Sequence, residues 1–434
     1  MQIGWPMTFA DVSSDGQRGR PSAEPSHEGT TASVVAGSAL AQPLRAIADQ
    51  PAEAQQRLGY ADTLREICQQ PGTWLETAGD MAKYGPRLST FLGAAGIADR
   101  RGALVLTGSG SSLYAAACVG PALQAALGVP VHVLAAGDLL THPQHALPPT
   151  RPCVVVSFGR SGNSPESTAV VDLLLACEPE CRHLLVTCCR SGRLATAYAG
   201  DARVFSLVLD ERTCDRSLVM TSSFTNMVVA ASALGMLHDL GGYQARVGVL
   251  SRAAEFLLSH EAQPLAALAR RPFRTVVFLG AGCRYGGARE ASLKMTEMSD
   301  GRMLSFAETY LGVRHGPMSA IRDEALVVCF LSSDPRARAY EADLVCELSR
   351  KRLGACKVLF GEAIPADLAV DGDVVVECPG MTAVGDDGAP VLDVLVGQLL
   401  AFFHCLHLGL RPDSPSASGV INRVVEPFTI HRQT

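Results

Sequence analysis

The sequence predicts an α/β protein built from two tandem parallel sheets, each flanked by helices. Three observations support this prediction. Short β-branched runs alternate with helical patterns, which is typical of doubly wound parallel sheets. An apolar strand, a Gly/Ser loop and a helix follow one another from residue 103, and the same order starts again at residue 275, which indicates a duplicated domain. The chain has 434 residues, 47% of them hydrophobic, and this is enough for more than one buried core.

The first part of the chain precedes these repeats. Residues 1–42 mix Ser, Gly, Pro and Glu with short apolar pieces and show no sustained period, so we expect a disordered N-terminal extension. This stretch also lacks the charged start and apolar centre of a signal peptide. Residues 43–98 have apolar positions at helical spacing, separated by charged residues, and we expect a helical segment there.

The first α/β domain is expected at residues 99–243. Its strands are short β-branched runs, and its helices are longer periodic stretches between them. In chain order the predicted elements are strand 103–107, helix 112–127, strand 130–134, strand 153–157, helix 165–177, strand 183–187, helix 192–199, strand 203–208 and a largely helical stretch at 213–240.

The second α/β domain is expected at residues 244–411. Its predicted elements are a helical stretch at 251–270, strand 275–279, a glycine loop at 280–287, helix 288–299, strands 325–331, 356–360 and 373–377, and a closing apolar helix at 391–408. Four polar residues interrupt the apolar stretch 391–410, which would be costly in hydrocarbon, so we expect a buried or interface helix and no membrane span. Residues 412–434 form a polar tail that we expect to fold over the active site.

Composition excludes several classes of function. The net charge of -6 comes with no basic block or aromatic-basic interleaving, so the sequence gives no support for nucleic-acid binding. The 14 cysteines are dispersed without a Cys-x-x-Cys pair, as expected for small core residues in a reducing cytoplasm. Two Cys/His groups, at 177–183 and 404–407, lack the paired ligand spacing of a structural zinc site, so we expect no metal.

The segment 153–167 has the features of a phosphate-binding loop. A buried-strand pattern runs into a hydroxyl-rich turn, and a helix follows with Pro165 at its first position. Free N–H groups and the positive end of the helix dipole converge there with the hydroxyls of Ser157, Ser161 and Ser164 and the guanidinium of Arg160. A plain turn with a helix cap is the alternative interpretation.

A second loop repeats this design upstream. Ser111 and Ser112 follow the predicted strand 103–107 and open the next helix. In open α/β sheets ligands bind at the carboxyl ends of the strands, so neighbouring loops can hold one phosphate from two sides. Neither loop is a Walker motif or reads Gly-x-Gly-x-x-Gly. The two loops together therefore favour a phosphorylated small molecule over a nucleotide.

The predicted helix 288–299 carries the candidate acid–base groups. Glu290, Lys294 and Glu297 are spaced by four and three residues, which points the two carboxylates within roughly 20° of each other with the lysine beside them. An exposed face with a Glu-Lys pair is the alternative. Only four of the 37 Lys and Arg residues are lysines, so a lysine here indicates a need for a compact ammonium whose proton affinity can be tuned.

Two further residues are candidates for the site. His315 stands between Arg314 and a Gly-Pro turn, and a histidine can open a sugar ring by moving a proton between its oxygens. A loop histidine with a structural hydrogen bond is the alternative. Arg423 lies in the polar tail, where it could supply a charge when the tail excludes water from the site. A plain surface tail is the alternative there.

These motifs together resemble the sugar isomerase (SIS) domain family, and within it the tandem-domain phosphosugar isomerases. The likeness covers roughly residues 55–430. The strings at 157–167, 220–225, 314–317 and 422–425 are most similar to the galactosamine-6-phosphate deaminase/isomerase branch, also known as tagatose-6-phosphate ketose/aldose isomerases. The resemblance implies two tandem SIS domains, each a parallel sheet flanked by helices with flavodoxin-like layering.

The resemblance also implies roles for individual residues. Glu297 matches the base that moves a proton between C1 and C2, and Glu290 and Lys294 match charged neighbours that tune the site. His315 matches a ring-opening histidine that arrives from the other subunit in relatives, so a homodimer or higher homo-oligomer with a shared active site is expected. The residues expected to bind the sugar phosphate are Ser111, Ser112, Ser157, Arg160, Ser161 and Ser164, and Arg423 aligns loosely with a lysine of the related synthase tail.

The implied function is a cytoplasmic phosphosugar deaminase/isomerase that needs no metal or redox cofactor. An amino-hexose 6-phosphate, with D-galactosamine 6-phosphate first among the candidates, would give a ketose 6-phosphate such as tagatose 6-phosphate and ammonia. No cysteine glutaminase domain precedes the repeats, which favours release of ammonia. A simple ketose/aldose isomerase and a non-catalytic phosphosugar-sensing regulator are the alternatives, and the galacto or gluco configuration of the substrate stays open.

Overall fold

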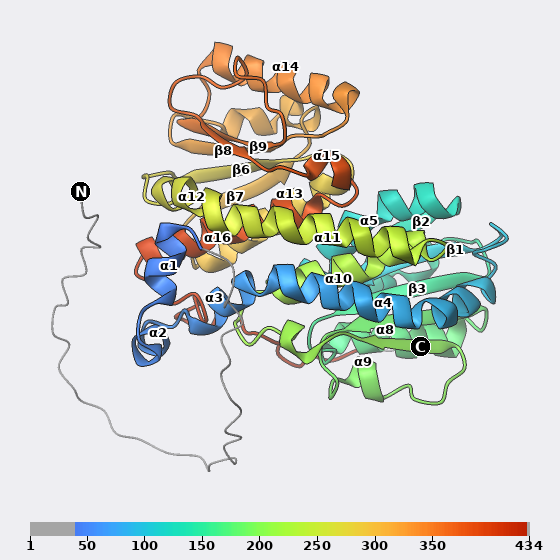
Figure 1. Ribbon diagram of the computed structural model, residues 1–434. Helices are drawn as coiled ribbons and strands as arrows, with labels where there is room; N and C mark the ends of the chain where they lie inside the picture. The colour runs from blue at the N-terminus through green and yellow to red at the C-terminus, as the bar shows by residue number, and fades with distance from the viewer. Residues whose placement is uncertain (1–39, 432–434) are drawn as a thin grey trace. The chain divides into compact units, whose positions relative to one another are not determined.

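The computed structural model describes residues 40–431, and these residues all belong to one unit of the chain. The predicted disordered extension lies outside the described residues except for its last three positions. The predicted helical segment is confirmed by four helices, of which the longest, α4, packs against α10 and α11 (Figure 1). The four helices of the segment are α1 (Gln42–Ala48), α2 (Ala52–Leu58), α3 (Ala61–Cys68) and α4 (Gln70–Gly93). The two helices that pack against α4 are α10 (Ser222–Ser232) and α11 (Leu240–Phe256).

The first sheet has five parallel strands in the order β2-β1-β3-β4-β5. Every residue of β1 and β3 is buried, which is why both strands appear in the sequence as continuous apolar runs. The strands are β1 (Ala103–Gly108), β2 (Val131–Ala135), β3 (Cys153–Gly159), β4 (Cys181–Thr187) and β5 (Val204–Val208). The helices of this half are α5 (Ser111–Leu127), α6 (Ala136–Thr141), α7 (Pro143–Ala146), α8 (Pro165–Cys177) and α9 (Arg193–Thr196).

The second sheet repeats the first. Its five parallel strands have the order β10-β9-β8-β6-β7, so β6 corresponds to β1 and β8 corresponds to β3. The strands are β6 (Thr275–Leu279), β7 (Leu304–Glu308), β8 (Ala325–Phe330), β9 (Cys356–Gly361) and β10 (Val374–Glu377), and the helices are α12 (Ala262–Leu268), α13 (Cys283–Met298), α14 (Pro335–Lys351), α15 (Met381–Val384) and α16 (Pro390–His407).

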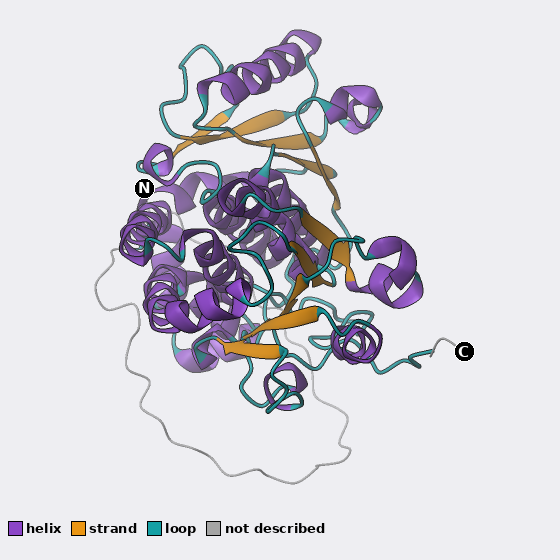
Figure 2. Ribbon diagram, turned by 90° about the vertical axis from the view of Figure 1, so that its right-hand side faces the viewer, coloured by secondary structure: helices purple, strands orange, loops and turns teal. Residues whose placement is uncertain are grey.

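The predicted fold class, with two tandem doubly wound parallel sheets, is therefore confirmed. Figure 2 shows helices between the two groups of strands. Among these helices, α13 packs against α5 of the first half and against α16 of its own half. The predicted domain boundaries at residues 99, 244 and 412 stay predictions, because both sheets belong to one compact unit of the chain.

The predicted glycine loop at 280–287 is wrong over most of its length. Helix α13 already begins at Cys283, so Gly286 and Gly287 are helical residues. A Cβ atom at Gly286 would lie 2.6 Å from the backbone nitrogen of Cys118 in α5, so this glycine lets the two helices approach closely. The predicted helix 192–199 is also too long, since α9 covers only Arg193–Thr196.

The apolar helix α16 is buried, as predicted. Within residues 40–431 it is the one helix long and apolar enough to cross a membrane, and 89% of its length is buried inside the structure. Its polar residues have partners in the core: Arg284 donates to Asp393 at 3.0 Å, and Gln70 donates to Gln398 at 2.7 Å. These bonds explain how a polar interruption is tolerated in a core helix.

Candidate functional site

A cleft of about 670 Å³ lies between the two halves of the described chain. Five parts of the sequence border it: the loop that follows β1, the loop that follows β3, the segment after β5 at Leu218 and Met220, the helix α13, and the C-terminal tail. The lining includes Ser161 of the first half and Glu297 of the second half. The hydroxyl-rich loops and the acid–base helix therefore face one cavity.

The two loops present helix N-termini to this cleft. Ser111 and Ser112 begin α5, and Ser161 and Ser164 precede α8, whose first residue is Pro165. β1 and β3 are neighbours in the sheet, and the crossovers leave them in opposite directions, so the loops flank the switch point where α/β proteins bind ligands. N–H groups and hydroxyls at two helix N-termini can solvate a phosphate.

Ser157 lies deeper than the other predicted serines. It is a buried residue of β3, and its hydroxyl has no hydrogen-bond partner in the described part of the chain. Its neighbour in register on β1, Thr107, has the same property. Neither residue lines the cleft. Direct contact between Ser157 and a phosphate stays a prediction.

Arg160 has an unexpected set of partners. Its guanidinium donates to the carbonyl oxygens of Ser217 at 3.1 Å and Leu218 at 2.9 Å, and also to that of Arg423 in the tail. The side chain lines the cleft but is almost wholly buried, and burial lowers the pKa of Arg160. The observed bonds tie the tail to the segment after β5, while the predicted contact with a phosphate stays untested.

The tail continues this attachment through Arg423. Its Nε donates to the carbonyl oxygen of Asp215 at 2.7 Å, and a terminal nitrogen of the same guanidinium donates to Cys214 Sγ at 3.4 Å. Residues 419–423, 425 and 426 line the cleft. The tail thus forms one wall of the cavity, and the charge of Arg423 is directed mainly at the protein.

The acid–base cluster on α13 is buried. Lys294 Nζ lies 3.1 Å from Glu290 Oε1 and 2.5 Å from Glu297 Oε2, and it donates a hydrogen bond to Ser111 Oγ at 3.1 Å. The side chains of Glu290 and Lys294 are fully buried, whereas Glu297 is 20% exposed and lines the cleft. The alternative of an exposed Glu-Lys face is therefore wrong for this helix.

The electrostatics of the cluster follow from burial and proximity. Burial raises the pKa of Glu290 to about 7, although Lys294 acts in the opposite direction. Burial acts to lower the pKa of Lys294, but the carboxylates of Glu290 and Glu297 outweigh it and raise this pKa. Lys294 therefore stays cationic in the core and holds Glu297 at the edge of the cleft.

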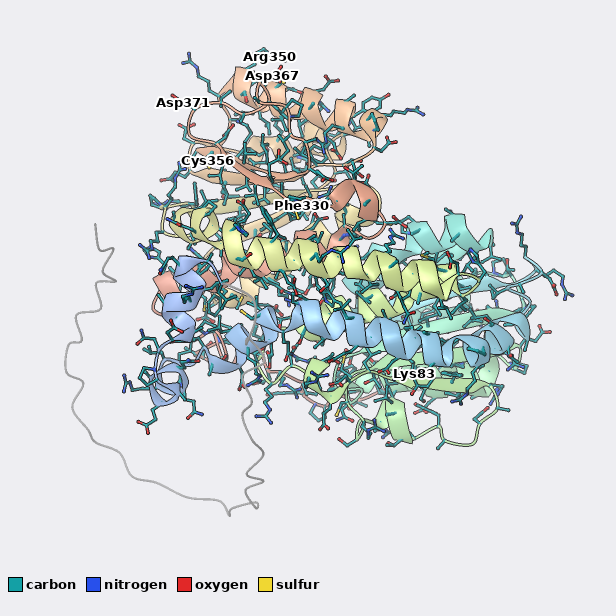
Figure 3. The ribbon with its side chains drawn as sticks, in the orientation of Figure 1. Lys83, Phe330, Arg350, Cys356, Asp367 and Asp371 are labelled. Carbon is teal, nitrogen blue, oxygen red and sulfur yellow. The ribbon has the colours of Figure 1, made fainter. Side chains whose placement is uncertain are left out.

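The burial of Lys294 differs from the position of another lysine of the chain, Lys83. Lys83 lies on α4, and 77% of its side chain is exposed (Figure 3).

His315 does not reach the cleft within one chain. It is exposed on a short 3₁₀ turn, Gly312–His315, and it is absent from the cleft lining. The neighbouring Arg314 is bound to Glu347 at 2.8 Å. A role for His315 in ring opening therefore requires a second subunit.

Sequence reasoning missed two carboxylates that support the tail. Glu66 of α3 accepts hydrogen bonds from the backbone N–H of Arg216 at 2.6 Å and from the hydroxyl of Ser217. Asp215 accepts from the N–H of Thr221 at 2.7 Å and from the two serines that follow it. Together they fix the segment that receives Arg160 and Arg423. An Asp followed closely by a Thr-Ser-Ser run was the available sequence signal.

A third missed carboxylate faces the cleft. Glu166 is buried in the first turn of α8 and lines the cavity, and its Oε2 has no hydrogen-bond partner in the described part of the chain. An acidic residue in the first turn of a helix is common, so no sequence pattern distinguished Glu166. Within residues 40–431 no group of three or more His, Cys, Asp or Glu side chains could hold a metal ion.

The loop after β8 in the second sheet corresponds to the loop after β3, and a carboxylate of the protein occupies it. After β8, which corresponds to β3, Ser332 donates its hydroxyl to Asp386, and the backbone N–H of Ser333 donates to the same carboxylate at 2.9 Å. The N–H of Ser332 is bound to Glu341 at 2.7 Å. An internal carboxylate thus occupies this loop, whereas the corresponding loop of the first half lines the cleft.

Two doubly wound halves, a serine-lined cradle and a carboxylate on the facing helix define a protein of the sugar isomerase (SIS) domain class. No family model matches the sequence. D-galactosamine-6-phosphate deaminase AgaS of Escherichia coli is 34% identical over 369 residues, which are 85% of this chain and 95% of that protein. The protein of the same name from Shewanella is 31% identical over 386 residues, 88% of this chain and 94% of that one. The chain belongs to the AgaS family.

Solved structures agree with this assignment. The crystal structure of tagatose-6-phosphate ketose/aldose isomerase from Escherichia coli has a TM-score of 0.76 and 30% identity, and the match covers 85% of this chain and 96% of that chain. The C-terminal domain of glucosamine-fructose-6-phosphate aminotransferase from Francisella tularensis has a TM-score of 0.67 at 17% identity, over 81% of this chain and 98% of that chain. The second match supports the fold alone.

Proposed function

We propose that this protein is a D-galactosamine-6-phosphate deaminase/isomerase that forms tagatose 6-phosphate and ammonia. The observation that carries the proposal is the common cleft of the serine loops and Glu297, in a chain of the AgaS family. The name of the relatives supplies the substrate. The sequence has no basic block and no Walker or Gly-x-Gly-x-x-Gly motif, which agrees with a small phosphorylated substrate.

In the proposed reaction, the substrate phosphate is bound by the N-termini of α5 and α8, with Ser112, Ser161 and Ser164 as donors. The sugar then extends across the cleft toward α13. Glu297 removes the proton from C2 of the open-chain amino sugar, giving an enolamine. Protonation at C1 gives a ketimine, and water hydrolyses it to the ketose 6-phosphate and ammonia.

The neighbours of Glu297 have positioning roles in this proposal. Lys294 fixes the Glu297 carboxylate through its 2.5 Å ion pair, and Glu290 balances the charge of the buried ammonium. Ser111 joins this cluster to the first loop through its bond from Lys294. His315 of a second subunit would assist ring opening, so the working form is a homodimer or a larger homo-oligomer. A cytoplasmic location remains part of the proposal.

A second candidate is a ketose/aldose isomerase without deamination, because the name of one related structure describes that activity. The two functions are separated by supplying galactosamine 6-phosphate, glucosamine 6-phosphate and galactose 6-phosphate to the purified protein and measuring ammonia and ketose in each reaction. Equal amounts of ammonia and ketose from galactosamine 6-phosphate are expected. Formation of ketose from galactose 6-phosphate, with no ammonia released from either amino sugar phosphate, would favour the plain isomerase.

A phosphosugar-sensing regulator is tested in the same reactions run in deuterated water. The proposed enzyme exchanges the hydrogen at substrate C2 with solvent, because Glu297 removes it as a proton. A sensor binds the sugar and leaves this hydrogen in place. Absence of exchange, with binding intact, would contradict the enzymatic function.

A further inference from the structure

Two cysteines lie together at the anchor of the tail. Cys189 follows β4 and Cys214 follows β5, and since β4 and β5 are adjacent parallel strands, their carboxyl-end loops are neighbours. The two side chains are close enough for each thiol to change the pKa of the other, and both thiols are free and partly exposed. Cys214 Sγ also accepts the hydrogen bond from Arg423 at 3.4 Å.

The surroundings of Cys189 favour reactivity. Its Sγ lies 3.4 Å from Ser191 Oγ. Burial acts to raise the pKa of the Cys189 thiol, but hydrogen bonds from Ser191, Cys214 and Gly192 outweigh it, and the pKa is lowered. Burial and the neighbouring Cys189 raise the pKa of Cys214. A more acidic, accessible thiol beside a second thiol is the arrangement of a redox-sensitive pair.

We propose that Cys189 and Cys214 form a reversible disulfide when a peroxide oxidises the protein, and that this bond loosens the anchor of the C-terminal tail. The Cys189 thiolate attacks one peroxide oxygen, the O–O bond breaks, and hydroxide leaves as Cys189 becomes a sulfenic acid. The Cys214 sulfur then attacks the sulfenic sulfur, the S–S bond forms, and water leaves with the Cys214 proton. Two electrons pass from the thiols to the peroxide, and a dithiol reductant restores both cysteines.

The consequence for the tail follows from bond length. Disulfide sulfurs are about 2.05 Å apart, much closer than two sulfurs that are not bonded, so the loops must approach each other and Cys214 must move relative to Arg423. Arg423 also binds the Asp215 carbonyl next to Cys214, and the same residue accepts from Arg160. A shift of Cys214 therefore acts on the wall of the cleft formed by residues 419–426.

The test uses the full chain treated with graded hydrogen peroxide, alkylated and mapped by mass spectrometry. The expected result is a cross-link between the peptides of Cys189 and Cys214 with a loss of about 2 Da, removed by dithiothreitol. Cys189→Ser and Cys214→Ser should each abolish it. Cys346→Ser, which removes an exposed thiol on α14, is the matched control and should leave it intact. Oxidation of Cys346 or Cys177 with the pair still reduced would overturn the proposal.

The effect on the tail is measured by limited proteolysis of the reduced and oxidised protein. Oxidation should make cleavage within residues 419–426 roughly fivefold faster, as expected for loss of one hydrogen bond of ordinary strength, and Cys189→Ser should remove this difference. A cross-link that leaves tail cleavage unchanged would refute the link to the tail. The rate of ammonia release, which rests on the proposed function, gives a separate readout, so its failure alone would count against the enzyme and not against the disulfide.

Discussion

At the level of single residues, the arrangement around Lys294 stands out. A buried ammonium is stable only with close partners, and Lys294 has two carboxylates and a hydroxyl. An arginine would bring a larger, planar group that stays protonated under all ordinary conditions. The scarcity of lysine in the sequence made this position noticeable, but its full burial could not be predicted, because burial depends on how α5 and α16 cover α13.

Replacement of Glu297 by Gln tests the proposed base. The amide has the same shape but cannot take a proton, so ammonia release should fall by about 10²–10⁴-fold. Binding of the phosphosugar, followed by calorimetry, should persist because the serine loops are unchanged. Glu324→Gln, at an exposed pair with Arg274, is the control and should keep full turnover. Undiminished ammonia release in the Glu297 variant would exclude its role.

Glu66 gives a pH prediction. Burial and the nearby Asp215 raise the pKa of Glu66 from its ordinary 4.5 to about 8 in the folded chain. Between these values the folded state holds a proton that the unfolded state releases, so the free energy of unfolding falls as pH rises, by about 1.4 kcal/mol per pH unit. Glu66→Gln should remove this dependence between about pH 5 and 8.

The measurement is urea unfolding of the wild type and of the Glu66→Gln variant at several pH values. The difference between their free energies of unfolding should move steadily in favour of the variant as pH rises through this window. Parallel curves for the two proteins would show that Glu66 does not hold the extra proton.

At the level of elements, the sequence was most informative for buried strands. The continuous apolar runs at β1, β3, β6 and β8 identified the centre of each sheet, and the Ser-Pro signal placed the start of α8 correctly. The start of α13 was predicted five residues late, because clustered glycines usually mark a loop. Here Gly286 serves a close helix contact, which belongs to tertiary structure and leaves no separate local signal.

The residues of the site, like the elements of the fold, were predictable only where local sequence determines them. Hydroxyl groups at helix starts follow from local sequence, so Ser112, Ser161 and Ser164 could be assigned to the cleft. The guanidinium groups of Arg160 and Arg423 are long and flexible, and their backbone partners lie more than 50 residues away in the chain. No local pattern could predict those partners.

The α5–α13 contact can be tested with a pair of glycine substitutions. Gly286→Ala would place a Cβ atom 2.6 Å from backbone nitrogen of Cys118, so the free energy of unfolding should fall by about 2–3 kcal/mol. Gly79→Ala, in the middle of α4, meets nothing within 4 Å and should raise stability by about 0.5–1 kcal/mol. Urea unfolding measures both, and equal effects at the two sites would contradict the close contact.

At the level of the whole molecule, the cleft is assembled from segments near residues 110, 160, 220, 297 and 420 of the chain. Neither half holds a complete site. His315 is exposed and does not line this cleft. The proposed role of His315 in ring opening therefore adds a requirement, namely a second copy of the chain that brings this residue to the cleft of its partner.

A mixing experiment checks this requirement. His315→Ala and Glu297→Gln should each be inactive, but a mixed dimer has one site with Glu297 from one subunit and His315 from the other. Equal amounts of the two variants, unfolded and refolded together, should therefore recover about a quarter of wild-type turnover if subunits pair at random. No recovery, with dimers formed, would place His315 outside the partner's site.

Asp386 has a consequence for stoichiometry. Duplication created two loops of one design, but in the second the carboxylate of Asp386 already accepts the donors of Ser332 and Ser333. A titration with inorganic phosphate should therefore saturate at one equivalent per polypeptide. The second half fills its own loop with an acid, and its contribution to the cleft is instead the Glu297 carboxylate of α13, which faces the loops of the first half.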